Sequence, residues 1–241
     1  MQSSQPLTLA DAIIPRIEGS SRVLVVARDL ALMLGFAGLV ALFAQIQVRL
    51  PWTIVPVTGQ TFAVLVTGAS LGAWRGAGAL SIYALTGMFL LPVFTPSVSP
   101  TSGTWDLHVI LPWVGNERPL WELSSGGYVV GFILSAAIVG WLAERAWDRK
   151  QWVHLGMLLA NAAIYVPGLL WLGYLIATDW VAPGGSRAIS EVITGSSTLE
   201  KTLNGGLYPF IVGDLMKLLL ASMVMPSAWL LVERLGRRRT R

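Results

Sequence analysis

The chain has 241 residues, of which 54% are hydrophobic and only 12% are charged. This is about half the charged fraction of a soluble domain, so the composition argues against a soluble protein. The formal net charge of +4 does not indicate nucleic-acid binding, because the basic residues fall in short loops and at the tail and form no stripe. The absence of cysteine excludes disulfides, thiolate metal sites and cysteine nucleophiles.

The apolar residues are concentrated in long runs. A hydrocarbon core of about 30 Å requires about 20 apolar residues in a helix. The alternating pattern of a membrane β-barrel strand is absent from the sequence. We therefore predict an all-α integral membrane protein that crosses the cell membrane several times.

The first 27 residues are predicted to be a cytoplasmic or interfacial N-terminal segment. They lack the basic region, apolar core and small-residue cleavage site of a secretory signal, so we expect them to remain on the mature protein. Near Leu9 to Ile17 the sequence allows either a short amphipathic interfacial helix or a loosely ordered tail.

Residues 28–233 are predicted to form a membrane domain of six transmembrane helices, followed by a basic cytoplasmic tail at 234–241. The second and third hydrophobic segments are short, so we expect them to be tilted or partly re-entrant. The six segments are Leu30–Val48, Thr58–Ala73, Ala77–Leu91, Tyr128–Leu142, Leu155–Ala177 and Leu207–Val232.

The distribution of basic residues predicts the orientation of these segments. Most arginines and lysines fall in the N-terminal segment, the Trp74–Gly76 turn, the Glu144–Gln151 loop and the tail. By the positive-inside bias, these parts and both termini are cytoplasmic, and the long loops 92–127 and 178–206 lie outside.

An aspartate and a lysine, Asp214 and Lys217, lie inside the last apolar segment. Three residues of helix bring the two side chains to one face, about a turn apart. Charged residues within a membrane helix usually face the bundle interior and serve a pathway or a binding site. The pair lies about 10–15 Å from the outer end of its segment, which suits a pocket that opens outward.

Two interpretations of this pair remain open. The charges could neutralise each other and only lock the bundle, or they could bind a small polar solute. Aromatic residues that could form the wall of such a pocket are Tyr83, Tyr128, Tyr165, Trp171 and Tyr174.

Small residues recur at helix-packing spacing. One row is Ala27, Ala31 and Gly35, continued by Ala37 and Ala41, and another is Gly68, Gly72 and Gly76. Such rows let helix backbones approach closely in lipid. They could serve internal packing or provide a docking face for another membrane subunit.

The sequence carries no constellation that would support an enzyme. It has no phosphate-binding G-x-x-x-x-G-K-[ST] loop, so ATP hydrolysis by that route would have to come from a partner subunit. The only histidines, His108 and His154, are separated in an outer loop and at the cytoplasmic edge. We therefore expect no catalytic residues, no metal site and no cofactor in this chain.

Five motifs in order give the chain a specific resemblance to a known family. They are PVTGQT at 56–61, GAWRG at 72–76, Gly87 followed by LPVF at 91–94, GGYVVGF at 126–132, and GDLMK at 213–217. Together, over about residues 30–233, they resemble the BioY family, the biotin-capturing S components of energy-coupling factor (ECF) transporters.

The resemblance implies an S-component-like six-helix bundle that binds biotin from outside and associates with a transmembrane coupling subunit and two ATPase subunits. It implies that Asp214 and Lys217 contact biotin, with Tyr128 and the preceding Gly127 at the mouth of the site. The further pocket residues expected are Tyr83, Tyr165 and Trp171. The row Ala27, Ala31 and Gly35 would be the docking face, and the loop Arg49–Pro56 would help to cover the solute.

The chain also departs from the family pattern. The loop Thr95–Ser125 is longer than the usual connection, and Ser124-Ser125 stands where Pro-Thr often precedes the Gly-Gly-Tyr. The lid geometry is therefore not implied by the resemblance. Two alternatives remain besides biotin capture: an S component for another vitamin, or a structural membrane subunit whose polar pair serves packing only.

Overall fold

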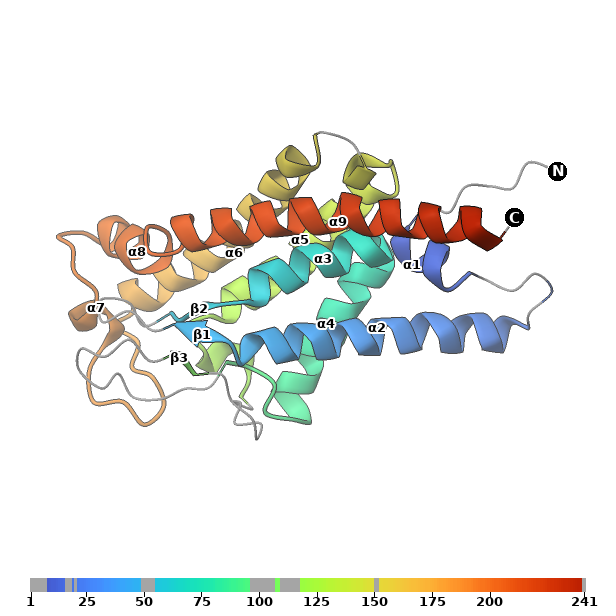
Figure 1. Cartoon of the computed structure of the whole chain (residues 1–241). Helices are drawn as coiled ribbons and strands as arrows, with labels where there is room; N and C mark the ends of the chain where they lie inside the picture. The colour runs from blue at the N-terminus through green and yellow to red at the C-terminus, as the bar shows by residue number, and fades with distance from the viewer. Residues whose placement is uncertain are drawn as a thin grey trace.

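The computed structural model describes residues 8–15, 19, 21–48, 55–95, 107–108, 118–149 and 152–239, and Figure 1 shows a mostly helical, elongated bundle. The predicted cover loop Arg49–Pro56 and the long loop Thr95–Ser125 lie largely outside the described residues. The side chain of His108 lies outside them as well.

Each of the six predicted hydrophobic segments contains a helix. These are α2 (Arg22–Ala44), α3 (Gln60–Leu71), α4 (Ala73–Phe89), α5 (Gly126–Ala143), α6 (Val153–Ala177) and α9 (Ile211–Arg239). In the described part of the chain, four are long and apolar enough to cross a membrane: α2, α5, α6 and the Ile211–Leu235 part of α9.

The two short segments form a sharply bent pair. Helix α3 has 12 residues and is about 18 Å long, too short to cross a hydrocarbon core of about 30 Å on its own. Gly72 alone separates α3 from α4, and its φ of 87° lies in the left-handed region that glycine tolerates. The chain turns there, and α4 runs steeply across the direction of its neighbours (Figure 1).

Two helices, α2 and α9, extend well beyond their predicted hydrophobic segments. Helix α2 begins at Arg22, eight residues before the predicted Leu30, because Ser21 caps its first turn by accepting from the Leu24 N–H. Helix α9 continues to Arg239. Hydropathy marks where a helix is apolar, whereas backbone hydrogen bonding continues past that boundary.

A short helix precedes the bundle. Helix α1 (Leu9–Ile13) has Thr8 as its N-cap, and Leu9 and Ala10 are buried against α3 and α9. The sequence left open either a short helix or a loosely ordered tail for this segment. Residues 9–13 form a helix, and burial holds this helix against the bundle.

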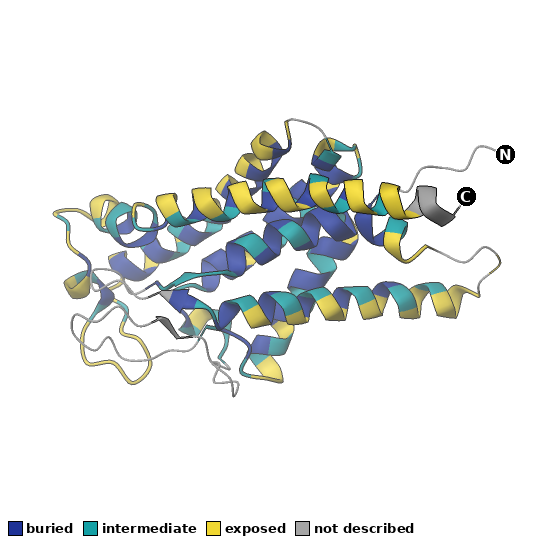
Figure 2. Ribbon diagram, in the orientation of Figure 1, coloured by how far each residue is buried: buried dark blue, intermediate teal, exposed yellow. Residues whose placement is uncertain are grey.

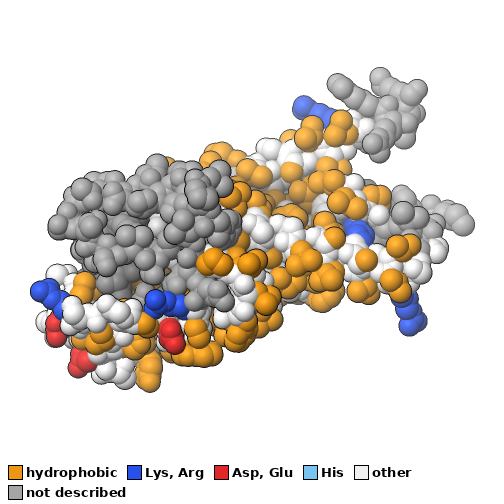
Figure 3. All heavy atoms as spheres, turned by 90° about the horizontal axis from the view of Figure 1, so that it is seen from below, with side chains coloured by type: hydrophobic (Ala, Val, Ile, Leu, Met, Phe, Trp, Pro, Cys, Tyr) orange, Lys and Arg blue, Asp and Glu red, His pale blue; other side chains and the backbone are white. Residues whose placement is uncertain are grey.

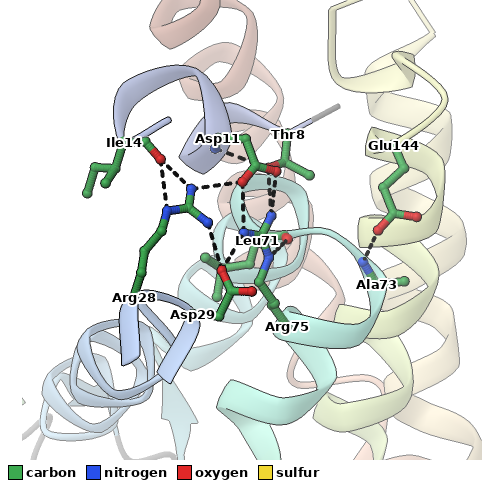
Figure 4. Close-up of polar contacts among 9 residues, drawn as sticks. All are labelled: Thr8, Asp11, Ile14, Arg28, Asp29, Leu71, Ala73, Arg75 and Glu144. Atoms are coloured by element: carbon green, nitrogen blue, oxygen red, sulfur yellow. Dashed lines mark hydrogen bonds and ion pairs between the residues drawn. The ribbon is translucent and has the colours of Figure 1, made fainter. Parts of the chain in front are cut away.

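A buried charge cluster ties α1 to α2 and α4 (Figure 4). Arg75 donates to Asp11 at 2.7 Å and to Asp29 at 3.2 Å, and Arg28 donates to the same two carboxylates at 2.8 and 2.7 Å. Arg75 also donates to the Leu71 carbonyl at the end of α3. Two arginines and two aspartates balance each other, which makes burial of Arg75 tolerable in a bundle with little water.

A small antiparallel sheet lies at the opposite end of the bundle from α1. Its strands are β1 (Gln47–Val48), β2 (Val57–Thr58) and β3 (Leu107–His108), in the order β2-β1-β3, with Gln47 opposite both Thr58 and His108. The fold is mostly helical, as predicted, but the prediction did not include this sheet, because strands of two residues leave no periodic pattern in a sequence.

The loop 178–206, which was predicted to lie outside, is compact. It contains α7 (Ile189–Val192) and α8 (Thr198–Gly206), and Ile189 and Ile193 are buried in the core. The 3₁₀ turns η1 (Leu120–Glu122) and η2 (Trp147–Arg149) complete the described elements.

The core lies around α3, whose residues are almost all buried, while the outward sides of α2 and α9 are exposed (Figure 2). Hydrophobic side chains cover the middle of the face in Figure 3, with charged side chains mainly toward its ends. This distribution suits a bundle with lipid around its middle.

Candidate ligand-binding site

A pocket lies among α3, α4, α5, α6 and α9 near the sheet end of the bundle. It holds about 590 Å³ of space, with the open solvent at its mouth included. Its lining combines aromatic rings with two groups of polar side chains: Val55, Pro56, Thr58, Gln60, Thr61, Tyr83, Phe94, Thr95, Ser125, Tyr128, Val129, Phe132, Ile164, Tyr165, Phe210, Asp214 and Lys217.

Asp214 is the centre of the first polar group. Its carboxylate is buried, and three side chains from three helices donate to it. Lys217 donates to Oδ1 at 2.7 Å, Thr61 to Oδ1 at 3.2 Å and Tyr165 to Oδ2 at 2.7 Å. Charge-assisted hydrogen bonds of this kind compensate the cost of burying the carboxylate.

Lys217 completes this group with a cation. Its ammonium carries three N–H donors, and Asp214 accepts one of them. Its side chain is 16% exposed and that of Asp214 is 8% exposed, so the lysine is the more accessible of the two. The remaining donors suit an anionic or carbonyl group of a ligand.

Gln60 is the centre of the second polar group. Its Nε2 donates to the Tyr83 hydroxyl at 2.7 Å, and its Oε1 accepts from Thr58 at 3.0 Å and from Thr95 at 3.1 Å. These contacts orient the amide at the first turn of α3, next to Thr61 of the first group. The start of α3 therefore contributes to both groups.

Aromatic rings line the space between the polar groups. Tyr128 contacts Tyr165 edge to face, with centroids 6.1 Å apart, and lies 6.4 Å from Phe210. Tyr83 contacts Phe94 in the same edge-on manner at 5.4 Å. Such a wall suits an apolar ring system with polar groups at its edges.

Five of the seven predicted ligand-binding residues line this pocket. They are Tyr83, Tyr128, Tyr165, Asp214 and Lys217. The hydroxyl of Tyr128 is already engaged, because it donates to the Gly206 carbonyl at 2.8 Å. The one donor of this hydroxyl is therefore used within the bundle.

The other two predicted residues, Gly127 and Trp171, lie in a shallow apolar groove between α5 and α6, outside the pocket lining. A Cβ at Gly127 would come within 2.4 Å of the Pro167 carbonyl oxygen and of the Trp171 Cβ. Close helix packing therefore requires this glycine. Trp171 donates to the Leu123 carbonyl at 2.9 Å and fixes the segment before α5.

Residue-by-residue reasoning missed the Gln60 group and the threonine that contacts Asp214. Gln60 and Thr61 belong to the PVTGQT motif and are polar residues at the start of an apolar segment, which is a usable sign. Phe94, Phe132 and Phe210 could not be distinguished from ordinary core residues.

The predicted docking residues Ala27, Ala31 and Gly35 are all exposed on the outer side of α2. A Cβ added at Gly35 would meet no described atom within 4 Å. Ala37 and Ala41, in contrast, face the core. In the second row, a Cβ at Gly68 would come within 2.5 Å of the Ala136 carbonyl, so this row serves internal packing.

The described residues contain no group of three or more histidine, aspartate and glutamate side chains that could hold a metal ion. His154 is exposed near the start of α6, away from the pocket. The side chains that line the pocket offer hydrogen bonds, an ion pair and aromatic contacts.

Comparison with known proteins identifies the family. A model of the BioY family matches residues 15–105 and 120–234, which is most of the chain. The chain belongs to the BioY family. Relatives include a biotin transporter BioY of Thermotoga maritima, 26% identical with 78% of this chain and 88% of the relative covered. Another, from Rhizobium etli, is 27% identical, with 82% and 90% covered.

A solved structure supports the fold of this BioY family member. The S-component for biotin from an ECF-type ABC transporter matches with a TM-score of 0.61, covering 91% of this chain and 95% of that one at 16% identity. The predicted S-component-like bundle in the membrane is thereby confirmed at the level of fold.

Proposed function

We propose that this protein captures biotin outside the cell and serves as the substrate-binding subunit of an ECF-type transporter. The observation that carries the proposal is the buried pair Asp214 and Lys217 in an aromatic pocket, in a chain whose relatives are named biotin transporters.

The ligand chemistry fits the polar group around Asp214. Biotin has a ureido group with two N–H donors and a carbonyl, an apolar bicycle, and a carboxylate on a flexible chain. Asp214 can accept from a ureido N–H, and the free donors of Lys217 can reach the ureido carbonyl or the carboxylate. The rings of Tyr128, Phe132 and Phe210 would cover the bicycle.

We further infer that α3 and α4 lie within the bilayer, which gives six membrane segments and two cytoplasmic termini. The positive charge at the α1 end supports this orientation. The pocket would then open outward at the sheet end, and loop 178–206 would form part of its outer rim.

The exposed row Ala27, Ala31 and Gly35 supports docking of a transmembrane coupling subunit, because small residues allow a second helix to approach closely. Two ATPase subunits would complete the transporter, with ATP used by them and not by this chain. Ala31→Leu should reduce copurification of the coupling subunit, while biotin binding stays unchanged.

A biotin titration of the purified protein in detergent tests the main proposal. We expect saturable binding below micromolar ligand, with loss of affinity in Asp214→Asn and Lys217→Gln. Absence of saturable binding at micromolar biotin would refute the proposal. Competition with thiamin and riboflavin separates biotin from another vitamin as the solute.

A further inference from the structure

The connection between α5 and α6 has an unusual composition. The twelve residues from Trp141, in the last turn of α5, to Trp152, just before α6, contain three tryptophans, two arginines and a lysine. Trp141, Trp147 and Trp152 are 49%, 37% and 53% exposed, although large aromatic side chains are usually buried. The pocket and the α2 docking row do not include these residues, and exposed tryptophan is typical of the membrane interface.

Arg145 is held in place with most of its donors unused. Its guanidinium carbon lies 3.7 Å from the ring centroid of Trp141, and one terminal nitrogen donates to the Trp141 carbonyl at 2.9 Å. The Arg145 side chain is exposed. A planar guanidinium stacked on a ring is oriented in advance, and its free edge suits bidentate binding of a phosphate.

Arg149 is oriented in the same way by another helix. Its guanidinium carbon lies 3.5 Å from the ring centroid of Trp229 on α9. The Trp229 Nε1–H donates to Asp148 Oδ2 at 2.5 Å, which fixes the ring. The segment from Trp141 to Trp152, called the turn below, is therefore attached to α9. The sequence of α9 continues into Arg234 and a further run of arginines.

The acidic side chains of this turn face the protein. Asp148 is buried and accepts from the Trp229 Nε1–H. Glu144 accepts from the Ala73 N–H at 2.8 Å, as Figure 4 shows. Their charges are used within the bundle, whereas the guanidinium of Arg145 faces outward. The surface of the turn is therefore basic and rich in tryptophan.

We propose that this turn, with Arg145 as its anchor, binds the phosphate headgroup of an anionic phospholipid. Charge complementarity and position both favour a lipid. The turn joins the end of the apolar helix α5 to the start of the apolar helix α6. Tryptophan rings with arginines beside them are typical of the boundary between hydrocarbon and headgroups. Anionic lipids also concentrate on the cytoplasmic leaflet, where the basic residues place this turn.

Native mass spectrometry of the intact protein tests the site. The protein is incubated with phosphatidylglycerol or phosphatidylcholine of matched chain length, and retained lipid is counted. We expect wild-type protein to retain phosphatidylglycerol preferentially, and Arg145→Gln to reduce that retention about fivefold, the effect expected of one basic residue. Retention of phosphatidylcholine should not change.

Arg187→Gln is the matched control, because Arg187 is an exposed arginine in the outer loop. It should leave phosphatidylglycerol retention at the wild-type value. Equal losses in both variants, or no loss in Arg145→Gln, would overturn the proposal. Displacement of the lipid by millimolar inorganic phosphate, or by an acidic peptide at the concentration of the lipid, would also overturn it, since the site would not then select a phospholipid.

Discussion

Tyr165 on α6 donates its hydroxyl hydrogen to Oδ2 of Asp214 on α9, across 2.7 Å. The other carboxylate oxygen accepts from Lys217 and from Thr61 on α3. One buried charge therefore connects α3, α6 and α9 at the level of the pocket. A ligand that takes up or releases one of these hydrogen bonds would change the contacts of all three helices.

Tyr165→Phe should destabilise the protein, because it removes one of the three donors to the buried Asp214 carboxylate. Hydrogen bonds to charged groups contribute about 1.5–3 kcal/mol. The unfolding temperature in detergent should fall, as measured by the loss of intrinsic tryptophan fluorescence. Tyr174→Phe is the control, since Tyr174 lies on the same helix with an exposed ring. Equal effects of the two variants would contradict the role given to the Tyr165 hydroxyl.

The pair Asp214 and Lys217 should show strong coupling in a double-mutant cycle. Removing one partner of a buried ion pair costs about 3–5 kcal/mol, because the other charge is left without compensation. Asp214→Asn and Lys217→Met together should therefore cost less stability than the sum of the two single variants.

Biotin binding separates the two interpretations of this pair. If the Asp214 and Lys217 pair contacts the ligand, the double variant should recover stability relative to the single variants but should not recover biotin affinity. Recovery of both would mean that the pair serves packing only. Unfolding and titration of the same four proteins provide both measurements.

The sequence predicted the helices and the charged pair, because both depend on local patterns. Runs of apolar residues reveal a membrane helix, and charges inside such a run are conspicuous. The Gln60 contacts with Tyr83 and Thr95 could not be predicted, since these residues are 23 and 35 positions away and only the fold brings them together. Gly127 shows the opposite limit: the sequence indicates that a small residue is needed but not which neighbour requires it.

Gly68→Ala and Gly35→Ala should differ sharply in their effect on stability, although both add one methyl group to a membrane helix. The Cβ at residue 68 would come within 2.4 Å of the Val139 side chain and 2.5 Å of the Ala136 carbonyl, so α3 and α5 would have to separate. Overpacking of this kind costs about 1–3 kcal/mol. At residue 35 the methyl group would meet no described atom within 4 Å. Thermal unfolding of the two variants measures the contrast, and similar unfolding temperatures would show that the α3 and α5 contact is looser than described.

Asp11→Asn should reduce stability at neutral pH and much less in acid. Burial alone would raise the pKa of Asp11, but hydrogen bonds from Arg75, Thr8 and Arg28 outweigh that effect and hold the pKa well below its ordinary value of 3.8. A carboxylate whose pKa is lowered by folding contributes stability above its unfolded pKa and loses that contribution as the pH falls toward its folded pKa.

The difference in unfolding temperature between wild type and Asp11→Asn should therefore be constant from pH 7 to about 5 and narrow below about pH 4. Taking the difference cancels the carboxylates that both proteins share. Glu191→Gln, at an exposed position in loop 178–206, should show no such dependence. The opposite result is a difference in unfolding temperature between wild type and Asp11→Asn that stays constant down to pH 3. That result would mean that Asp11 acts through packing of α1 and not through its ion pairs with Arg28 and Arg75.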